Sequence, residues 1–219
     1  MFDANGIKGI LFDLDGTLIE SSEDIAGAAN YLRRIRGLEA LSLKTVASYV
    51  GDGIEALVSR LIETNDPDQV AACVGQFKAY YHDHCVDQTR LYEDVLPTLQ
   101  ELKRRGYHLA VVTNKPAGIS RRILQGLGVG QYFQTVVGGD STHQKKPHHA
   151  PMHLACRELD VQPAHCAMVG DSHVDVAAGK GVAMRTVGIR DGIGDQAKLE
   201  AAGADLMLNG FKELLDQLP

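Results

Sequence analysis

Two aspartates separated by one residue follow an apolar run near the start of the chain, in the segment Ile10-Leu11-Phe12-Asp13-Leu14-Asp15-Gly16-Thr17. Alternate side chains of a strand share a face, so a strand end that carries Asp13 and Asp15 can point both into one small volume. Two carboxylates at that distance repel each other, and the repulsion is relieved by a hard cation with oxygen ligands, by a raised pKa of one carboxyl group, or by both. Phosphoryl chemistry needs such a site, whereas a plain Asp-Gly turn does not need the apolar run and the following threonine.

Further polar residues follow other apolar runs, at 108–113, 135–137 and 166–169, with shorter strand candidates at 185–187 and 206–208. These runs alternate with amphipathic helical patterns, which predicts an α/β fold with a doubly wound, Rossmann-like parallel sheet covered on both faces. Ligands of such sheets bind outside the carboxyl ends of the strands. The residues expected to meet there are Asp13, Thr113, Asn114, Gly138-Gly139-Asp140 and Gly170-Asp171-Ser172.

About seventy residues after the first strand have helical spacing instead. Ser21-Ser22-Glu23-Asp24 is typical of a capping box, a short helix is expected over 43–50, and Asp66-Pro67 begins a helix that continues to about His84. We therefore expect an all-helical cap domain over residues 20–88, inserted into an α/β core domain formed by residues 1–19 and 89–219.

Composition limits the class of protein. A net charge of -6 and a pI near 5.8 argue against a nucleic-acid or anionic-membrane surface. The sequence contains no signal-peptide pattern and no apolar run of the ~20 residues needed to cross a bilayer, so a cytoplasmic protein is expected. The four cysteines are widely spaced and are expected to be buried thiols rather than zinc ligands or disulfides. Four histidines at 143, 148, 149 and 153 fit an exposed loop better than a metal site.

Together with Lys146-Pro147, the strand ends resemble the haloacid dehalogenase superfamily, whose four motifs are matched in order. The matching residues are Asp13-Leu14-Asp15-Gly16-Thr17, Thr113, Lys146 and Gly170-Asp171-Ser172-His173-Val174-Asp175. The helical insertion after the first motif is similar to the first cap type of that superfamily, and the likeness covers nearly the whole chain.

This resemblance implies that Asp13 is a nucleophile forming an aspartyl-phosphate and that Asp15 is the acid and base for the leaving group and for water. It also implies Mg²⁺ bound by Asp13, the backbone carbonyl of Asp15 and Asp171.

Several residues are expected to support these groups. Thr113 and Asn114 would donate hydrogen bonds to the phosphoryl group, Lys146 would supply positive charge, and Thr17 would contribute a further hydroxyl to substrate binding. Asp175, with Ser172 beside it, would hold a metal-bound water or pair with Lys146. A simple helix-start carboxylate is the alternative for Asp175.

The substrate class follows from Asp15 and from the cap. Asp15 indicates a phosphotransferase rather than a dehalogenase, because only an oxygen leaving group needs a proton. Gly51-Asp52-Gly53 before a helix is similar to the phosphoglycolate phosphatase pattern and predicts binding of a small carboxylated phosphate, although a plain turn is the alternative. A small phosphorylated metabolite is thus the expected partner of a monomer or homodimer. A mutase resembling β-phosphoglucomutase, a pyrophosphatase or another phosphatase of the superfamily, and a non-catalytic phosphate-binding regulator are alternatives.

Overall fold

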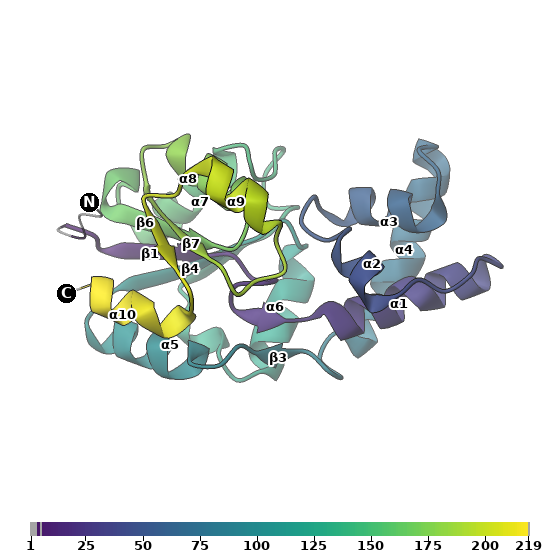
Figure 1. The fold of residues 1–219 in the computed structure, drawn as a ribbon, viewed down its shortest axis with the longest axis horizontal. Helices are drawn as coiled ribbons and strands as arrows, with labels where there is room; N and C mark the ends of the chain where they lie inside the picture. Colours follow the sequence, from purple (N-terminus) through teal and green to yellow (C-terminus); the bar gives the residue numbers. More distant parts are fainter. Residues whose placement is uncertain (1–3, 5, 219) are drawn as a thin grey trace.

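A computed structural model describes residue 4 and residues 6–218 of the chain, and it contains a parallel six-stranded sheet in the order β5-β4-β1-β6-β7-β8 (Figure 1). The strands are β1 (Gly9–Phe12), β2 (Ile19–Glu20), β3 (Arg90–Leu91), β4 (His108–Val112), β5 (Thr135–Val137), β6 (Cys166–Gly170), β7 (Arg185–Ile189) and β8 (Leu206–Leu208). In the centre of the sheet, Phe12 lies between Val111 of β4 and Val169 of β6. The carboxyl ends of β4, β1 and β6 therefore adjoin one another, as the sequence predicts.

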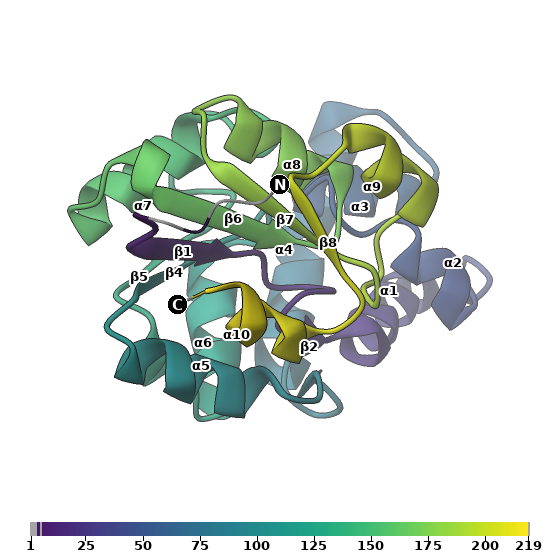
Figure 2. The ribbon, with the colours of Figure 1, turned by 60° about the vertical axis from the view of Figure 1, so that its left-hand side comes forward.

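Helices cover both faces of this sheet (Figure 2). The helices are α1 (Ser22–Ile35), α2 (Leu43–Ala47), α3 (Ile54–Ile62), α4 (Pro67–His84), α5 (Val95–Arg104), α6 (Ala117–Gly126), α7 (Ala150–Leu159), α8 (His173–Lys180), α9 (Gln196–Ala202) and α10 (Leu214–Gln217), with short 3₁₀ turns η1 (Gly130–Tyr132), η2 (Pro163–His165) and η3 (Phe211–Glu213).

The two faces bury separate sets of side chains because successive residues of a strand point to opposite sides. Ile10 and Phe12 of β1 pack on the face of α5, α6 and α10, whereas Leu11 packs on the face of α7. A strand buried on both faces must be apolar throughout, which explains the continuous apolar runs of the sequence. The predicted doubly wound α/β core is confirmed.

Helices α1–α4 pack together beside the sheet, and we call residues 22–84 the cap (Figure 1). The cap joins the core through the antiparallel pair β2 and β3. The buried carboxylate of Asp24 in α1 accepts hydrogen bonds from the backbone N–H groups of Gln88 and Thr89 and from the Thr89 hydroxyl at 2.7–3.1 Å. Asp24 therefore ties the first cap helix to the segment that returns to the core.

Two local predictions for the cap need correction. Ser21 precedes α1, but its side chain makes no capping hydrogen bond, and its hydroxyl instead donates a hydrogen bond to Asp15. The second helix ends at Ala47 rather than at Val50. By contrast, the fourth helix begins where Asp66-Pro67 predicts, with the Asp66 carboxylate accepting hydrogen bonds from two N–H groups.

No helix among the described residues combines the length and apolarity needed to cross a bilayer.

Candidate active site

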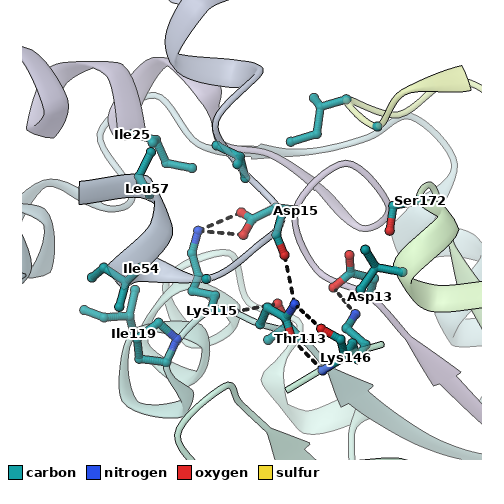
Figure 3. Close-up of a pocket in the computed structure, with 18 of the residues that line it drawn as sticks. Asp13, Asp15, Ile25, Ile54, Leu57, Thr113, Lys115, Ile119, Lys146 and Ser172 are labelled. Atoms are coloured by element: carbon teal, nitrogen blue, oxygen red, sulfur yellow. Dashed lines mark hydrogen bonds and ion pairs between the residues drawn. The ribbon is translucent and has the colours of Figure 1, made fainter. Parts of the chain in front are cut away.

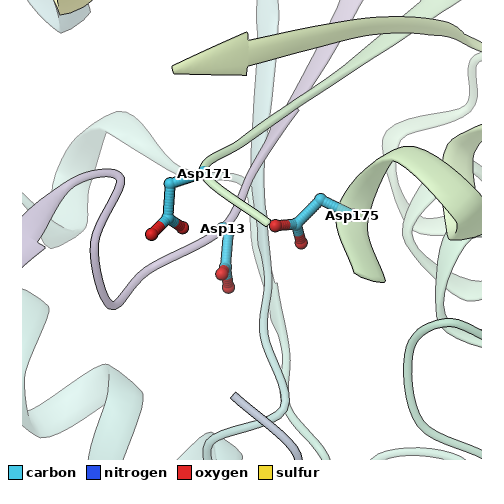
Figure 4. A group of neighbouring side chains, drawn as sticks. All are labelled: Asp13, Asp171 and Asp175. Atoms are coloured by element: carbon cyan, nitrogen blue, oxygen red, sulfur yellow. The ribbon is translucent and has the colours of Figure 1, made fainter. Parts of the chain in front are cut away.

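Three carboxylates from separate elements meet at the carboxyl end of the sheet (Figure 4). Asp13 follows β1, Asp171 follows β6, and Asp175 lies in the first turn of α8. One oxygen of each lies within 4.8 Å of the other two. Asp171 and Asp175 are buried, and 14% of the Asp13 side chain is exposed. Within the described part of the chain, this is the one cluster of three acidic, histidine or cysteine side chains spaced to hold a metal ion.

These carboxyl groups lie where negative charge is unfavourable. Burial, then repulsion from Asp175, raises the pKa of Asp13 from 3.8 to about 6 in spite of the nearby Lys146. Burial and repulsion from Asp13 and Asp175 raise the pKa of Asp171 to about 8. A hard divalent cation relieves such repulsion, and carboxylate oxygens are the ligands that Mg²⁺ prefers. The donor set therefore fits Mg²⁺.

Lys146 provides the positive charge of this cluster. Its Nζ lies 2.8 Å from Oδ1 of Asp13 and 2.6 Å from Oδ1 of Asp175, and 2% of its side chain is exposed. Burial alone lowers the pKa of Lys146, but the two carboxylates outweigh burial and raise it. Asp175 also accepts from the backbone N–H and the hydroxyl of Ser172. Lys146 is thus a fixed ammonium beside Asp13, and the predicted pairing of Asp175 with Lys146 is present.

Asn114 lines the cavity and holds two loops in place through its side-chain amide. Its Oδ1 accepts from the N–H of Lys146, and its Nδ2 donates at 2.9 Å to the carbonyls of Lys146 and Gly51. Both amide hydrogens are therefore engaged in this structure, and donation from Asn114 to a phosphoryl group stays a prediction. Thr113 lines the cavity, and its hydroxyl accepts from the N–H of Lys115, which leaves the hydroxyl proton for donation.

Asp15 points away from the carboxylate cluster, toward the cap (Figure 3). Its two oxygens lie 2.7 and 2.8 Å from Nζ of Lys115, and Oδ1 also accepts from the Ser21 hydroxyl at 2.5 Å. Burial lowers the pKa of Lys115, but Asp15 and Tyr81 outweigh that effect and raise it. Sequence reasoning missed both Lys115 and Ser21. The available signal for Lys115 was its position directly after Thr113-Asn114 at the end of β4.

A cavity of about 830 Å³, including its part open to solvent, separates cap from core in front of these groups. Asp13, Asp15, Thr113, Lys115 and Lys146 line its core side. Its other walls are apolar, with Ile25, Val50, Ile54, Leu57, Phe77, Ile119, Val174 and Ile193 lining it. A mostly apolar cavity with a few convergent polar groups is typical of a small-molecule site.

The predicted cap residues divide between the cavity and the surface. Gly51 and Gly53 line the cavity. Asp52 lies outside the lining residues, because its exposed carboxylate pairs with Arg60 of α3. This placement corrects the expectation that Asp52 contacts substrate. Lys145 of the core pairs with Glu55 in the first turn of α3, so the cap and core touch beside Gly53.

Three further residues named in the sequence analysis, Thr17, Gly16 and Asp140, contact neighbouring groups of the protein. The Thr17 hydroxyl donates to Oδ1 of Asp171 at 3.1 Å and Thr17 is not among the lining residues, which corrects its predicted substrate contact. Gly16 has a φ of +84°, and a Cβ atom there would overlap Oδ2 of Asp171, so only glycine fits this turn. Asp140, expected in the cleft, instead accepts from the N–H of Ala117 at the start of α6.

Known proteins resemble this chain over nearly its whole length. The model of the haloacid dehalogenase-like hydrolase family matches residues 10–189. A phosphoglycolate phosphatase of Neisseria meningitidis serogroup A is 37% identical and covers 97% of this chain and 94% of its own. One from Pectobacterium atrosepticum is 34% identical, with coverage of 98% and 94%. The crystal structure of a predicted phosphoglycolate phosphatase from Haemophilus somnus superposes with a TM-score of 0.91 at 31% identity, covering 97% and 98% of the two chains. This chain therefore belongs to the haloacid dehalogenase-like hydrolase family.

Proposed function

We propose that this protein is a Mg²⁺-dependent phosphatase that hydrolyses small phosphate monoesters, with 2-phosphoglycolate as the expected substrate and glycolate and phosphate as products. The opposed directions of Asp13 and Asp15 carry this proposal. Asp13 faces Lys146 and the carboxylate cluster, whereas Asp15 faces the cavity beneath the cap. One carboxylate is therefore placed for the phosphorus atom and the other for the leaving oxygen.

In the proposed reaction, Asp15 carries a proton when the substrate is bound. An oxygen of Asp13 attacks phosphorus, and the bond from phosphorus to the leaving oxygen breaks as Asp15 gives that proton to the leaving oxygen. Water then attacks the phosphorus of the aspartyl-phosphate while Asp15 takes a proton from that water. The bond between phosphorus and Asp13 breaks, which regenerates the Asp13 carboxylate and releases inorganic phosphate. Lys146, and the hydroxyl of Thr113, stabilise the charge on the transferring group. Ser21 and Lys115 hold the Asp15 carboxylate toward the cap.

Asp13, Asp171 and the backbone carbonyl of Asp15 would hold Mg²⁺. The bound ion would neutralise the clustered carboxylates and the phosphate oxygens. Ser172 keeps Asp175 against Lys146, and Thr17 and Gly194 each donate a hydrogen bond to Asp171. We also propose that residues 1–19 and 89–219 form the core domain and that residues 20–88 form a cap domain, which contains the cap helices of residues 22–84.

The relatives from Neisseria meningitidis and Pectobacterium atrosepticum support the choice of substrate, because both match over nearly their full length and both are named phosphoglycolate phosphatases. The cap supports it physically. The core motifs serve any phosphate monoester, so discrimination has to come from what closes over the leaving group. Gly51 and Gly53 allow the chain before α3 to lie close to the cavity, both with positive φ values.

The test is phosphate release from 2-phosphoglycolate, a hexose phosphate, a nucleoside monophosphate and pyrophosphate, each with Mg²⁺ and with excess chelator. We expect the highest kcat/KM for 2-phosphoglycolate and no turnover in chelator. Asp13→Asn should be inactive with an unchanged circular dichroism spectrum. Asp83→Asn is the matched control, because Asp83 is 73% exposed and pairs with the adjacent His82. Turnover by Asp13→Asn, or full activity in chelator, would refute the mechanism.

A further inference from the structure

A second cation faces the cavity on the side of the leaving group. Lys115 lines the cavity with 8% of its side chain exposed, and its charge faces one carboxylate, Asp15, whereas Lys146 faces two. An ammonium has three N–H donors, and the two oxygens of Asp15 account for two of them. Asp15 is the one carboxylate of the described residues that pairs with Lys115, and the third N–H lies near the Tyr81 hydroxyl, so an anion placed between these two groups could bind without releasing Asp15.

Tyr81 of α4 places a second donor beside this ammonium. Tyr81 lines the cavity at 3% exposure, and its ring centroid lies 5.0 Å from Nζ of Lys115. The buried hydroxyl has no hydrogen-bond partner of good geometry among the described residues. Burial raises the pKa of Tyr81, so the hydroxyl keeps its proton. Lys115 has no lone pair to accept that proton, and a buried donor without an acceptor is costly.

We propose that Nζ of Lys115 and the hydroxyl of Tyr81 form a subsite for the carboxylate of the substrate. The inference rests on the proposed phosphatase function and deepens it by naming the group that selects the substrate. One donor comes from the core after β4 and the other from the cap, so the carboxylate would join the two across the cavity. The apolar side chains of the walls strengthen an ionic contact there, because they lower the polarity of its surroundings.

The distances also limit the length of the substrate. Asp15 must hydrogen-bond the leaving oxygen, and Lys115 hydrogen-bonds Asp15, so the leaving oxygen and Nζ lie about two hydrogen-bond lengths, or ~5 Å, apart. A carboxylate on the carbon that bears the phosphate ester reaches Nζ across that gap. The subsite therefore suits 2-phosphoryloxy carboxylates, and a substrate with one more carbon between ester and carboxylate should fit worse.

The experiment compares 2-phosphoglycolate with its uncharged amide, 2-phosphoglycolamide, at saturating Mg²⁺. We expect Lys115→Met to lower kcat/KM for the acid about 10- to 100-fold more than for the amide, mainly through KM. Tyr81→Phe should lose selectivity of the same kind but by a smaller factor, and Lys115→Arg should restore part of it. Lys78→Met is the matched control, because Lys78 also lines the cavity and is half-exposed.

Equal losses on both substrates in Lys115→Met would overturn the subsite, since Lys115 would then act only through Asp15. Loss of selectivity in Lys78→Met but not in Lys115→Met would overturn it as well. A parent enzyme that hydrolyses the amide as well as the acid keeps the phosphatase function and refutes the subsite.

A binding measurement separates the two proposals further. Titration calorimetry with Asp13→Asn, in the presence of Mg²⁺, should show tighter binding of the acid than of the amide, and the added Lys115→Met change should remove that difference. The same preference in both proteins would refute the subsite even if no turnover were found. Absence of turnover in the parent protein, with the preference intact, would instead refute the phosphatase function alone.

Discussion

Replacing Asp171 by asparagine tests how the carboxylate cluster is balanced. The change removes one negative charge and retains an oxygen that can accept a hydrogen bond from the Thr17 hydroxyl or the Gly194 N–H. In excess chelator at pH 8 we expect Asp171→Asn to be more stable than the parent protein. With Mg²⁺ the order should reverse, because the parent gains stability by binding the ion and the variant lacks a ligand.

The magnitude follows from the pKa of Asp171, which burial and its neighbours raise from 3.8 to about 8. A carboxyl group with a raised pKa in the folded state gives up stability as the pH rises from about 4 to about 8, because the unfolded chain releases the proton first. At 1.36 kcal/mol per pKa unit, the loss is on the order of 5 kcal/mol. The Coulomb repulsion between two carboxylates has a similar size, since two unit charges within 4.8 Å of each other repel by about 3 kcal/mol or more at an effective dielectric constant of about 20.

The assay is urea and thermal unfolding of both proteins at pH 5 and pH 8, each with chelator and with Mg²⁺. We expect the Tm of the variant in chelator at pH 8 to exceed that of the parent by about 10 °C, with a smaller difference at pH 5. Mg²⁺ should raise the Tm of the parent more at pH 8 than at pH 5, since protons compete with the ion. Equal stability of the two proteins in chelator at pH 8, or an undiminished Mg²⁺ effect in the variant, would refute this account.

Two more changes test the surroundings of the site. Asp175→Asn removes one of the two anions that hold Lys146, so kcat should fall about 10- to 100-fold with little change in the circular dichroism spectrum, and an unchanged kcat would contradict the positioning role. Gly53→Val puts a β-branched residue at a φ of +93° with its Cβ 2.9 Å from Nζ of Lys145. The KM for 2-phosphoglycolate should therefore rise by a larger factor than kcat falls for an aryl phosphate. Equal losses on both substrates would argue against a role of this turn in cap closure.

The core of the fold could be predicted because its signals are local. Each central strand is a short apolar run buried on both faces, and polar residues begin where the strand ends, as at Phe12 and Asp13. Adjacent parallel strands bring their carboxyl ends together, so the order of the motifs was sufficient to predict that Asp13 and Asp171 meet. The fourth cap helix was predictable for a similar reason, since Asp66 caps it through its own backbone neighbours.

Contacts that depend on the path of the chain in space were predicted less well. Ser21 matches a capping box, but in the structure its hydroxyl donates a hydrogen bond to Asp15, and that contact depends on the path of the chain through β2. Asn114 has the donors that a phosphoryl group needs, yet backbone carbonyls from the cap and from the loop of Lys146 engage both amide hydrogens. Residue type alone cannot distinguish a donor for substrate from a donor for the backbone.

Selection of the substrate depends on how the cap sits on the core, which no motif describes. Helical spacing places Tyr81 on the buried stripe of α4, but the stripe does not say that this ring meets Lys115 of the core. That meeting depends on how the cap is placed on the core, and the Asp24 carboxylate contributes to this placement by accepting hydrogen bonds from the returning chain at Gln88 and Thr89. In the proposed function, the core motifs thus determine which bond is broken, whereas contacts between residues more than thirty positions apart determine which molecule carries that bond.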